Sequence, residues 1–219
     1  MAGSGLKYYV YISGTKVEML YSQIPPAFLK GAEAEFKINL GVISTSLKGR
    51  GPEEARELPA RVAAVSSYLR DQSEVGTAEN PKGWIEGVLS MRWGCVREYA
   101  SDIAFFGGIV GTTTVALLGS SESIIGTPKT AEANHAPFYY TMKFFNQMLQ
   151  NRRFKPPDEW NSPHENGEAK PPYYSYPESV DIAFKALAGS DANLEFLAMV
   201  LHKQKHLLVA TPLYVALSK

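Results

Sequence analysis

The sequence contains a single cysteine, Cys95, in 219 residues, so no disulfide can form within the chain. One cysteine fits a reducing compartment, and we expect a cytoplasmic protein. The 22 basic side chains are balanced by 22 acidic ones, whereas a nonspecific nucleic-acid binder carries a basic excess. No apolar run is long enough to cross a bilayer, and no signal-peptide pattern opens the chain. We therefore expect neither nucleic acid nor membrane as a partner.

Several catalytic and cofactor signatures are also missing. The phosphate-loop and dinucleotide-binding glycine spacings do not occur, and no serine lies in a G-x-S-x-G elbow. His202 and His206 stand four residues apart, but without a nearby acidic or sulfur ligand they are better interpreted as cations at a helix end. Cys95 has the sequence context of a packed thiol. The sequence therefore predicts no metal site and no cofactor.

The centre of the chain, residues 84–126, has the pattern of three strands followed by a short helix. In the first strand the residues on one face are apolar, because side chains alternate between faces; they are Ile85, Gly87, Leu89, Met91 and Trp93. The second strand, 103–109, contains Gly107-Gly108, and the third, 112–118, is β-branched and ends at Gly119. This stretch predicts a half-buried sheet at the heart of the fold.

Further elements follow from periodicity and helix-start signals. Residues 6–13 and 207–217 are predicted strands, and Thr15 and Glu18 have the spacing of a capping box at the start of a helix. Other predicted helices begin near residue 51, with Pro59 as an awkward member, and cover 141–152 and 179–187. The remaining two predictions are a strand at 36–47 and a last helix that starts at Ser190-Asp191 and buries Leu194, Leu197, Val200 and Leu201.

Together these elements predict one α+β domain spanning residues 6–219. Its core is a mixed β-sheet of about six strands with helices mainly on one face, closed by pairing of the first and last strands. Residues 153–178 hold six of the 14 prolines and no apolar period, so they form a Pro-rich insertion.

Two turns between a strand and a helix are the first candidate binding sites. They consist of Ser13, Gly14 and Thr15, and of Gly119, Ser120 and Ser121. Free amides at a helix start attract anions such as phosphate. The same hydroxyls also serve simply to cap their helices, and that interpretation is favoured over ligand binding.

Arg92 is the third candidate, because it points away from the apolar neighbours Met91 and Trp93. A guanidinium on a sheet face can bind a carboxylate or phosphate through two hydrogen bonds. The alternative is an internal ion pair. Glu86 lies about 20 Å away along an extended strand, so Glu98 or a carboxylate from another strand is the better internal partner. Both alternatives stay open.

Aromatic side chains in the Pro-rich insertion form a candidate partner surface. They are Trp160, Tyr173, Tyr174 and Tyr176. Exposed rings on a proline-stiffened segment suit contact with a protein or ligand. Rings folded back onto the domain are the alternative.

Four segments resemble a family of uncharacterised, mostly actinobacterial proteins of similar length. They are YYVYIS with KVEMLYSQIP near the start, MRWG at residues 91–94, FFGG with LLGSSESIIG between residues 105 and 126, and TPLYVAL at 211–217. The resemblance implies a single bacterial cytosolic domain. It implies no activity, cofactor or catalytic residue.

Two classes of function are compatible with these patterns. The first is a non-catalytic cytosolic binding module, a sensor or adaptor for a small anionic ligand or a protein partner. The second is an enzyme acting on a phosphorylated or nucleotide-like substrate, which would use Arg92 and the turn hydroxyls with Glu86 or Glu98 as acid and base. The arrangement of Arg92, a carboxylate and a helix start in one pocket would distinguish them.

Overall fold

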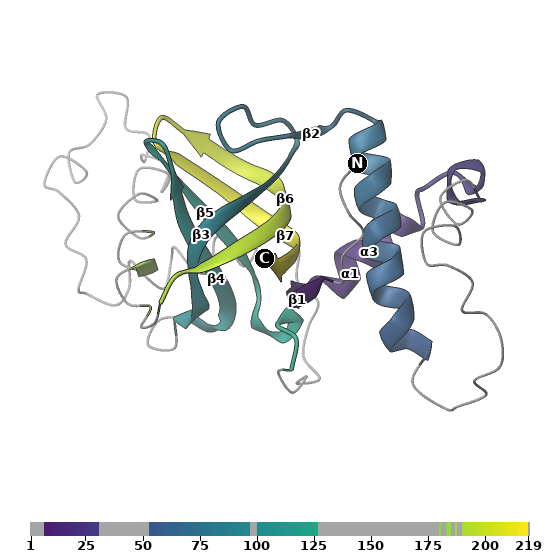
Figure 1. Ribbon diagram of the computed structural model, residues 1–219, viewed down its shortest axis with the longest axis horizontal. Helices are drawn as coiled ribbons and strands as arrows, with labels where there is room; N and C mark the ends of the chain where they lie inside the picture. The colour runs from purple at the N-terminus through teal and green to yellow at the C-terminus, as the bar shows by residue number, and fades with distance from the viewer. Residues whose placement is uncertain are drawn as a thin grey trace, which may run out of the picture.

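The computed structural model describes residues 7–30, 53–96, 100–126, 180, 183, 184, 187 and 190–218. Its helical elements are α1 (Gly14–Tyr21), α3 (Glu53–Asp71) and the short 3₁₀ helix η1 (Ser121–Ser123), and residues 26–30 are also helical. Its strands are β1 (Tyr8–Ile12), β2 (Val75–Gly76), β3 (Trp84–Val96), β4 (Ala100–Val110), β5 (Thr113–Ser120), β6 (Ala192–Gln204) and β7 (Leu207–Leu217). Figure 1 shows the strands gathered on one side and α1 and α3 on the other.

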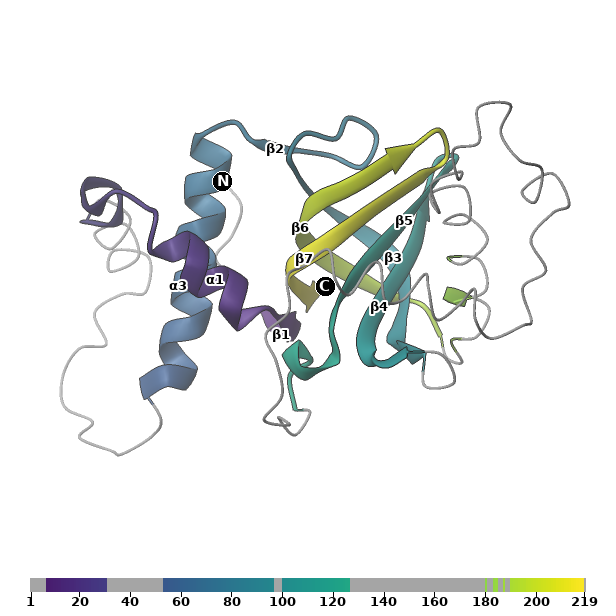
Figure 2. The ribbon, with the colours of Figure 1, turned by 180° about the vertical axis from the view of Figure 1, so that it is seen from behind.

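Five of the strands form a closed barrel. β3, β4 and β5 are antiparallel neighbours, β5 runs parallel to β7, and β6 closes the circle by pairing with both β7 and β3. β1 pairs with β7 in antiparallel orientation and β2 pairs with β3 in parallel orientation, which makes a mixed sheet of seven strands. The fold is thus α+β with a mixed sheet, and the predicted pairing of the first and last strands is confirmed. Figure 2 shows the barrel from behind.

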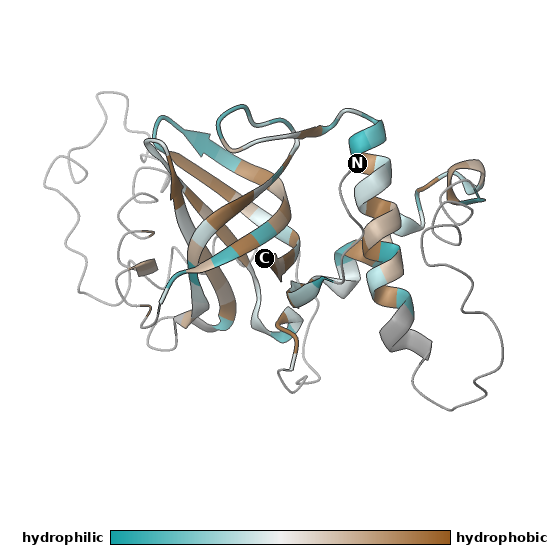
Figure 3. Cartoon of the chain, in the orientation of Figure 1, coloured by the Kyte–Doolittle hydropathy of each residue, from teal (hydrophilic) through white to brown (hydrophobic). Residues whose placement is uncertain are grey.

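The barrel interior is filled by side chains that alternate along the strands. Ile85 and Met91 of β3 are fully buried, as the predicted apolar face requires. Phe106 of β4 stacks on Trp93 with ring centroids 5.7 Å apart, and Tyr11 meets Phe106 edge to face at 5.6 Å. In Figure 3 the hydrophobic colour is concentrated on these strands and recurs in bands along α3.

Two outer layers cover the barrel wall on different sides. Val17 of α1 and three residues of α3 pack on β3, β6 and β7; the α3 residues are Val62, Val65 and Leu69. Val180, Ala183 and Leu187 pack instead on β4, β5 and the start of β7. The described helical residues lie against both sides of the wall. The structure therefore does not show helices mainly on one face, and that arrangement stays a prediction.

The last predicted helix, from Ser190-Asp191, is wrong. Residues 192–204 form β6, whose ladder with β7 shifts register between Leu197 and Ala198, opposite Pro212. A proline has no N–H to donate, so the strand continues past it only with such an irregularity. Pro59, in contrast, lies within an unbroken α3. The predicted elements at 36–47 and 141–152 and the Pro-rich insertion lie outside the described residues.

Candidate functional site

The first predicted turn is docked against the barrel. Ser13 occupies the N-cap position of α1 but makes no side-chain capping hydrogen bond, and its N–H donates to the Leu213 carbonyl at 2.9 Å. The helix begins at Gly14, one residue before Thr15, so the predicted capping box of Thr15 and Glu18 is wrong. Ser13 is only 7% exposed, whereas Thr15 faces solvent.

The second predicted turn lies beside β1. The Ser120 hydroxyl accepts the Glu122 N–H at 3.3 Å and caps η1, as the capping interpretation predicts, while Ser121 opens η1. Gly119 is buried against the ring of Tyr11. The two turns thus flank β1, but a three-residue 3₁₀ helix offers little positive end for an anion.

Arg92 makes an ion pair within the sheet. Its Nε donates to Asp191 Oδ1 at 2.8 Å, and its guanidinium lies 5.4 Å from the Phe184 ring centre. The internal ion pair, one of the two alternatives left open above, is therefore formed, but its carboxylate lies just before β6 rather than within a strand. Arg92 pairs with Gly107 of the neighbouring strand β4. Gly107 in turn pairs with Ala116 of β5, and Gly119 lies three residues further along β5, which puts it about 14 Å from Arg92. The structure does not bring Arg92 and the turns together.

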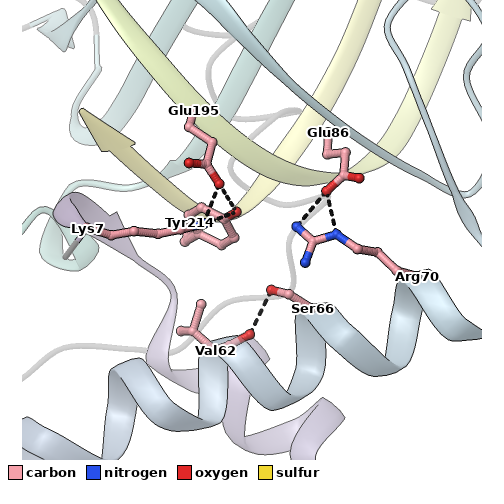
Figure 4. Close-up of polar contacts among 7 residues, drawn as sticks. All are labelled: Lys7, Val62, Ser66, Arg70, Glu86, Glu195 and Tyr214. Carbon is pink, nitrogen blue, oxygen red and sulfur yellow. Dashed lines mark hydrogen bonds and ion pairs between the residues drawn. The ribbon is translucent and has the colours of Figure 1, made fainter. Parts of the chain in front are cut away.

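A polar cluster that sequence reasoning missed lies between α3 and the barrel. We use "polar cluster" for Lys7, Arg70, Glu86, Glu195 and Tyr214. The Tyr214 hydroxyl donates to Glu195 Oε1 at 2.7 Å, and Lys7 Nζ donates to the same oxygen and to the Tyr214 hydroxyl. Arg70 forms an ion pair with Glu86, in which Nε and one terminal nitrogen contact Oε2 at 2.8 and 2.6 Å. Figure 4 shows these side chains pointing toward the space between α3 and the sheet.

The electrostatics of the polar cluster set the protonation states of Glu195 and Tyr214. Burial raises the pKa of Glu195, but the hydrogen bonds from Lys7 and Tyr214, helped by the Arg70 charge, hold it below its usual value. Burial and the bond to Glu195 raise the pKa of Tyr214 well above that of a free phenol. At neutral pH Glu195 is therefore an ionised acceptor and Tyr214 a neutral donor, an arrangement suited to holding groups in place rather than to accepting protons.

We expect Tyr214→Phe to lower the free energy of unfolding by about 2 kcal/mol, because it removes a hydrogen bond to a charged acceptor. Tyr214 is 1% exposed, and its hydroxyl also accepts a hydrogen bond from Lys7, so the substitution removes two interactions. The matched control is Tyr8→Phe, because Tyr8 is 71% exposed and the loss of its hydroxyl should change little. Urea unfolding measures both; equal effects would show that the Tyr214 hydroxyl contributes no more than a surface one.

A strip of the barrel wall next to the polar cluster is exposed. Two cross-strand pairs and one ion pair form it, and we call it the β3–β6 face: Val88 with Glu195, Ser90 with Asn193, and the ion pair of Arg92 with Asp191, the residue before β6. It lies between the wall covered by α3 and the wall covered by residues near Phe184. Val88 is 53% exposed, flanked by the Lys7–Glu195 and Arg92–Asp191 ion pairs.

The remaining candidates add no further site. Among the described residues no group of three His, Cys, Asp or Glu side chains is placed to hold a metal ion. His202 lies on β6 and His206 in the β6–β7 turn, so the helix-end interpretation of both is wrong. No helix in the described segments has the length and apolar character needed to cross a bilayer. The aromatic residues Trp160, Tyr173, Tyr174 and Tyr176 lie outside the described part.

Comparison with known proteins gives a family. No curated protein and no solved structure matches the chain. One family model matches residues 7–219, nearly the whole sequence, and its description assigns no function. This agrees with the resemblance to a family without an established activity. The chain belongs to the family of unknown function DUF7019.

Proposed function

We propose that this chain is a non-catalytic cytosolic binding module and that the β3–β6 face binds a protein partner. The observation that carries the proposal is the exposure of Val88 between two ion pairs on an exposed strip of the wall. Protein interfaces combine an apolar centre with a polar rim and are enriched in arginine. Because Asp191 and Phe184 hold the Arg92 guanidinium, ordering it on binding costs little entropy.

A small anionic ligand fits this face less well than a protein. An anion at Arg92 must compete with Asp191, and an anion at Lys7 must compete with Glu195. The enzyme alternative loses support as well, since Arg92 and the turn hydroxyls lie apart. A protein surface can instead accommodate both signs of charge at once by placing opposite charges across the interface.

Photo-crosslinking from position 88 tests the partner. A photoreactive amino acid replaces Val88, and, as the matched control, Ile109, which is 61% exposed on the outer wall of β4. In cells that encode the chain we expect one discrete crosslinked protein from position 88 and none from position 109. Adding Arg92→Asp should remove the crosslink, because it places two like charges side by side and reverses the charge that position 92 presents to the partner. Equal crosslinking from both positions, or crosslinking that ignores Arg92→Asp, would refute the β3–β6 face.

A thermal-shift screen separates the small-ligand alternative. Nucleotides, inorganic phosphate and sulfate are each added to the wild type and to Arg92→Gln. A ligand selective for the native state raises the melting temperature. A shift in the wild type that disappears in Arg92→Gln would replace the protein partner by a small anion at Arg92, whereas unchanged melting temperatures agree with the proposal.

A further inference from the structure

β7 changes its neighbour halfway along its length. On one edge it pairs with β6 throughout, but on the other it pairs with β5 only as far as Ala210 and with β1 from Tyr214 onward. Residues 211–213 have no strand beside them on that edge in the described segments. Their backbone groups lie in the interior and need other partners.

α1 supplies those partners. The Ser13 N–H donates to the Leu213 carbonyl, and Lys16 Nζ donates to the Pro212 carbonyl at 2.8 Å and to the Thr211 hydroxyl. Thr211 is fully buried and Lys16 is only 9% exposed. The amine of Lys16 therefore takes the place of a strand at the junction between β5 and β1.

No carboxylate among the described residues pairs with this amine. Its acceptors are a hydroxyl and a carbonyl, both uncharged, and a buried unpaired ammonium is costly. Burial lowers the pKa of Lys16 to about 7. A neutral amine still has two N–H donors, enough for both acceptors.

Several charged and titratable groups on the elements around Lys16 have partners of their own. Glu18 of α1 pairs with Arg61 of α3, which also holds Glu57, and Tyr214 of β7 belongs to the polar cluster. The other such groups with described side chains on these elements are Tyr8, Tyr9, Tyr11, Tyr21, Tyr68, Arg70, Asp71 and Glu122. Burial is the cause that lowers the pKa of Lys16, and no neighbouring charge in the described part of the chain offsets it. None of these groups therefore compensates the charge of a protonated Lys16.

We propose that the contact of Lys16 with Thr211 and Pro212 is a protonation-controlled joint: loss of the proton fastens α1 to β7, and gain of the proton releases α1 from the barrel. Release would expose Val17 and loosen the α1–α3 layer, which Glu18 and Arg61 tie together. This inference is independent of the β3–β6 face.

The direction of the pH effect follows from proton linkage. Released Lys16 has its ordinary pKa of 10.5 and binds a proton, whereas docked Lys16 is neutral above about pH 7. Between about pH 7 and pH 10.5 the released state holds more protons than the docked state. The equilibrium constant for docking therefore increases as the pH rises, by up to about tenfold per pH unit. From pH 7 to pH 9 the equilibrium constant for opening should fall about 50-fold. Below pH 7 both states are protonated and the effect levels off.

Amide hydrogen exchange measures the opening of α1. The probes are the Val17 and Ser22 amides, which donate to the Ser13 and Glu18 carbonyls, with exchange corrected for its intrinsic pH dependence. We expect the 50-fold change in the wild type and a flat profile in Lys16→Met. The control is Lys82→Met: Lys82 also donates to a carbonyl, that of Ser73 at 2.7 Å, but is exposed, so this variant should behave like the wild type.

Three results would overturn the joint. The first is a flat wild-type profile, and the second is an unchanged profile in Lys16→Met. The third is an equal change at the buried Phe106 amide of β4, which would place the proton's effect on the whole fold rather than on α1. If Lys16→Met does not fold, the Lys16 side chain is titrated by carbon NMR in the wild type. A value near 10.5 then rejects the proposal, and a value near 7 supports it.

Discussion

Replacing Phe106 by alanine is expected to lower the free energy of unfolding by about 3 to 5 kcal/mol. The ring is fully buried at the centre of the barrel, stacked on Trp93 and met edge to face by Tyr11. Removing it leaves a cavity that the surrounding strands cannot collapse into, because their hydrogen bonds hold the wall in a closed circle. The loss therefore includes both the transfer free energy of the ring and the cost of the cavity.

Chemical denaturation of Phe106→Ala at equilibrium measures this loss. The control is Ile109→Ala, three residues along the same strand but 61% exposed, which should change stability by no more than about 0.5 kcal/mol. A loss below about 1.5 kcal/mol in Phe106→Ala would mean that the barrel can repack and that its interior is not the rigid core described above.

The three central strands could be predicted because each shows a local signal. β3 alternates strictly, with Ile85 and Met91 facing inward and Glu86 outward, and β5 is β-branched before a glycine. β6 could not be predicted in the same way. Its inner face, Leu194 with Phe196, lines the barrel, while Leu197 on its outer face packs in the cluster that α3 covers. A strand buried on both sides loses alternation, and its apolar residues then fit a helical period equally well.

Because the sequence pattern predicts a helix in place of β6, neither the closed barrel nor the polar cluster could be predicted. β6 is the strand that joins β3 to β7, so without it the sheet stays open. Glu195 lies on β6, and it meets Lys7 only because β1, β7 and β6 are adjacent; 188 positions separate the two residues in sequence. No spacing rule connects residues so far apart. Arg92, in contrast, is visible locally as a charge between two large apolar residues, and the structure places it in an ion pair with Asp191.

Gly119 shows how the same residue fits two interpretations. In the sequence it belongs to a turn suited to an anion, whereas in the structure its missing side chain leaves room for Tyr11. A Cβ atom built at Gly119 lies 2.1 Å from the Tyr11 hydroxyl oxygen and 2.9 Å from the carbon that bears it. Such contacts are too short for real atoms, and Tyr11 is enclosed in the barrel core, with 1% of its surface exposed. The ring therefore has little room to move away.

Gly119→Ala should accordingly destabilise the fold by about 3 kcal/mol, at the upper end of the usual cost of overpacking. In a Tyr11→Phe background the closest clash disappears, and the same substitution should cost only about 1 kcal/mol. The difference is a coupling energy of about 2 kcal/mol, which a double-mutant cycle measures by urea unfolding. Gly14→Ala is the matched control, because no atom lies within 4 Å of its added Cβ and alanine favours a helix. Additive effects of the Gly119 and Tyr11 substitutions would show that the ring can leave its place, and the packing of Tyr11 against Gly119 would then not be rigid.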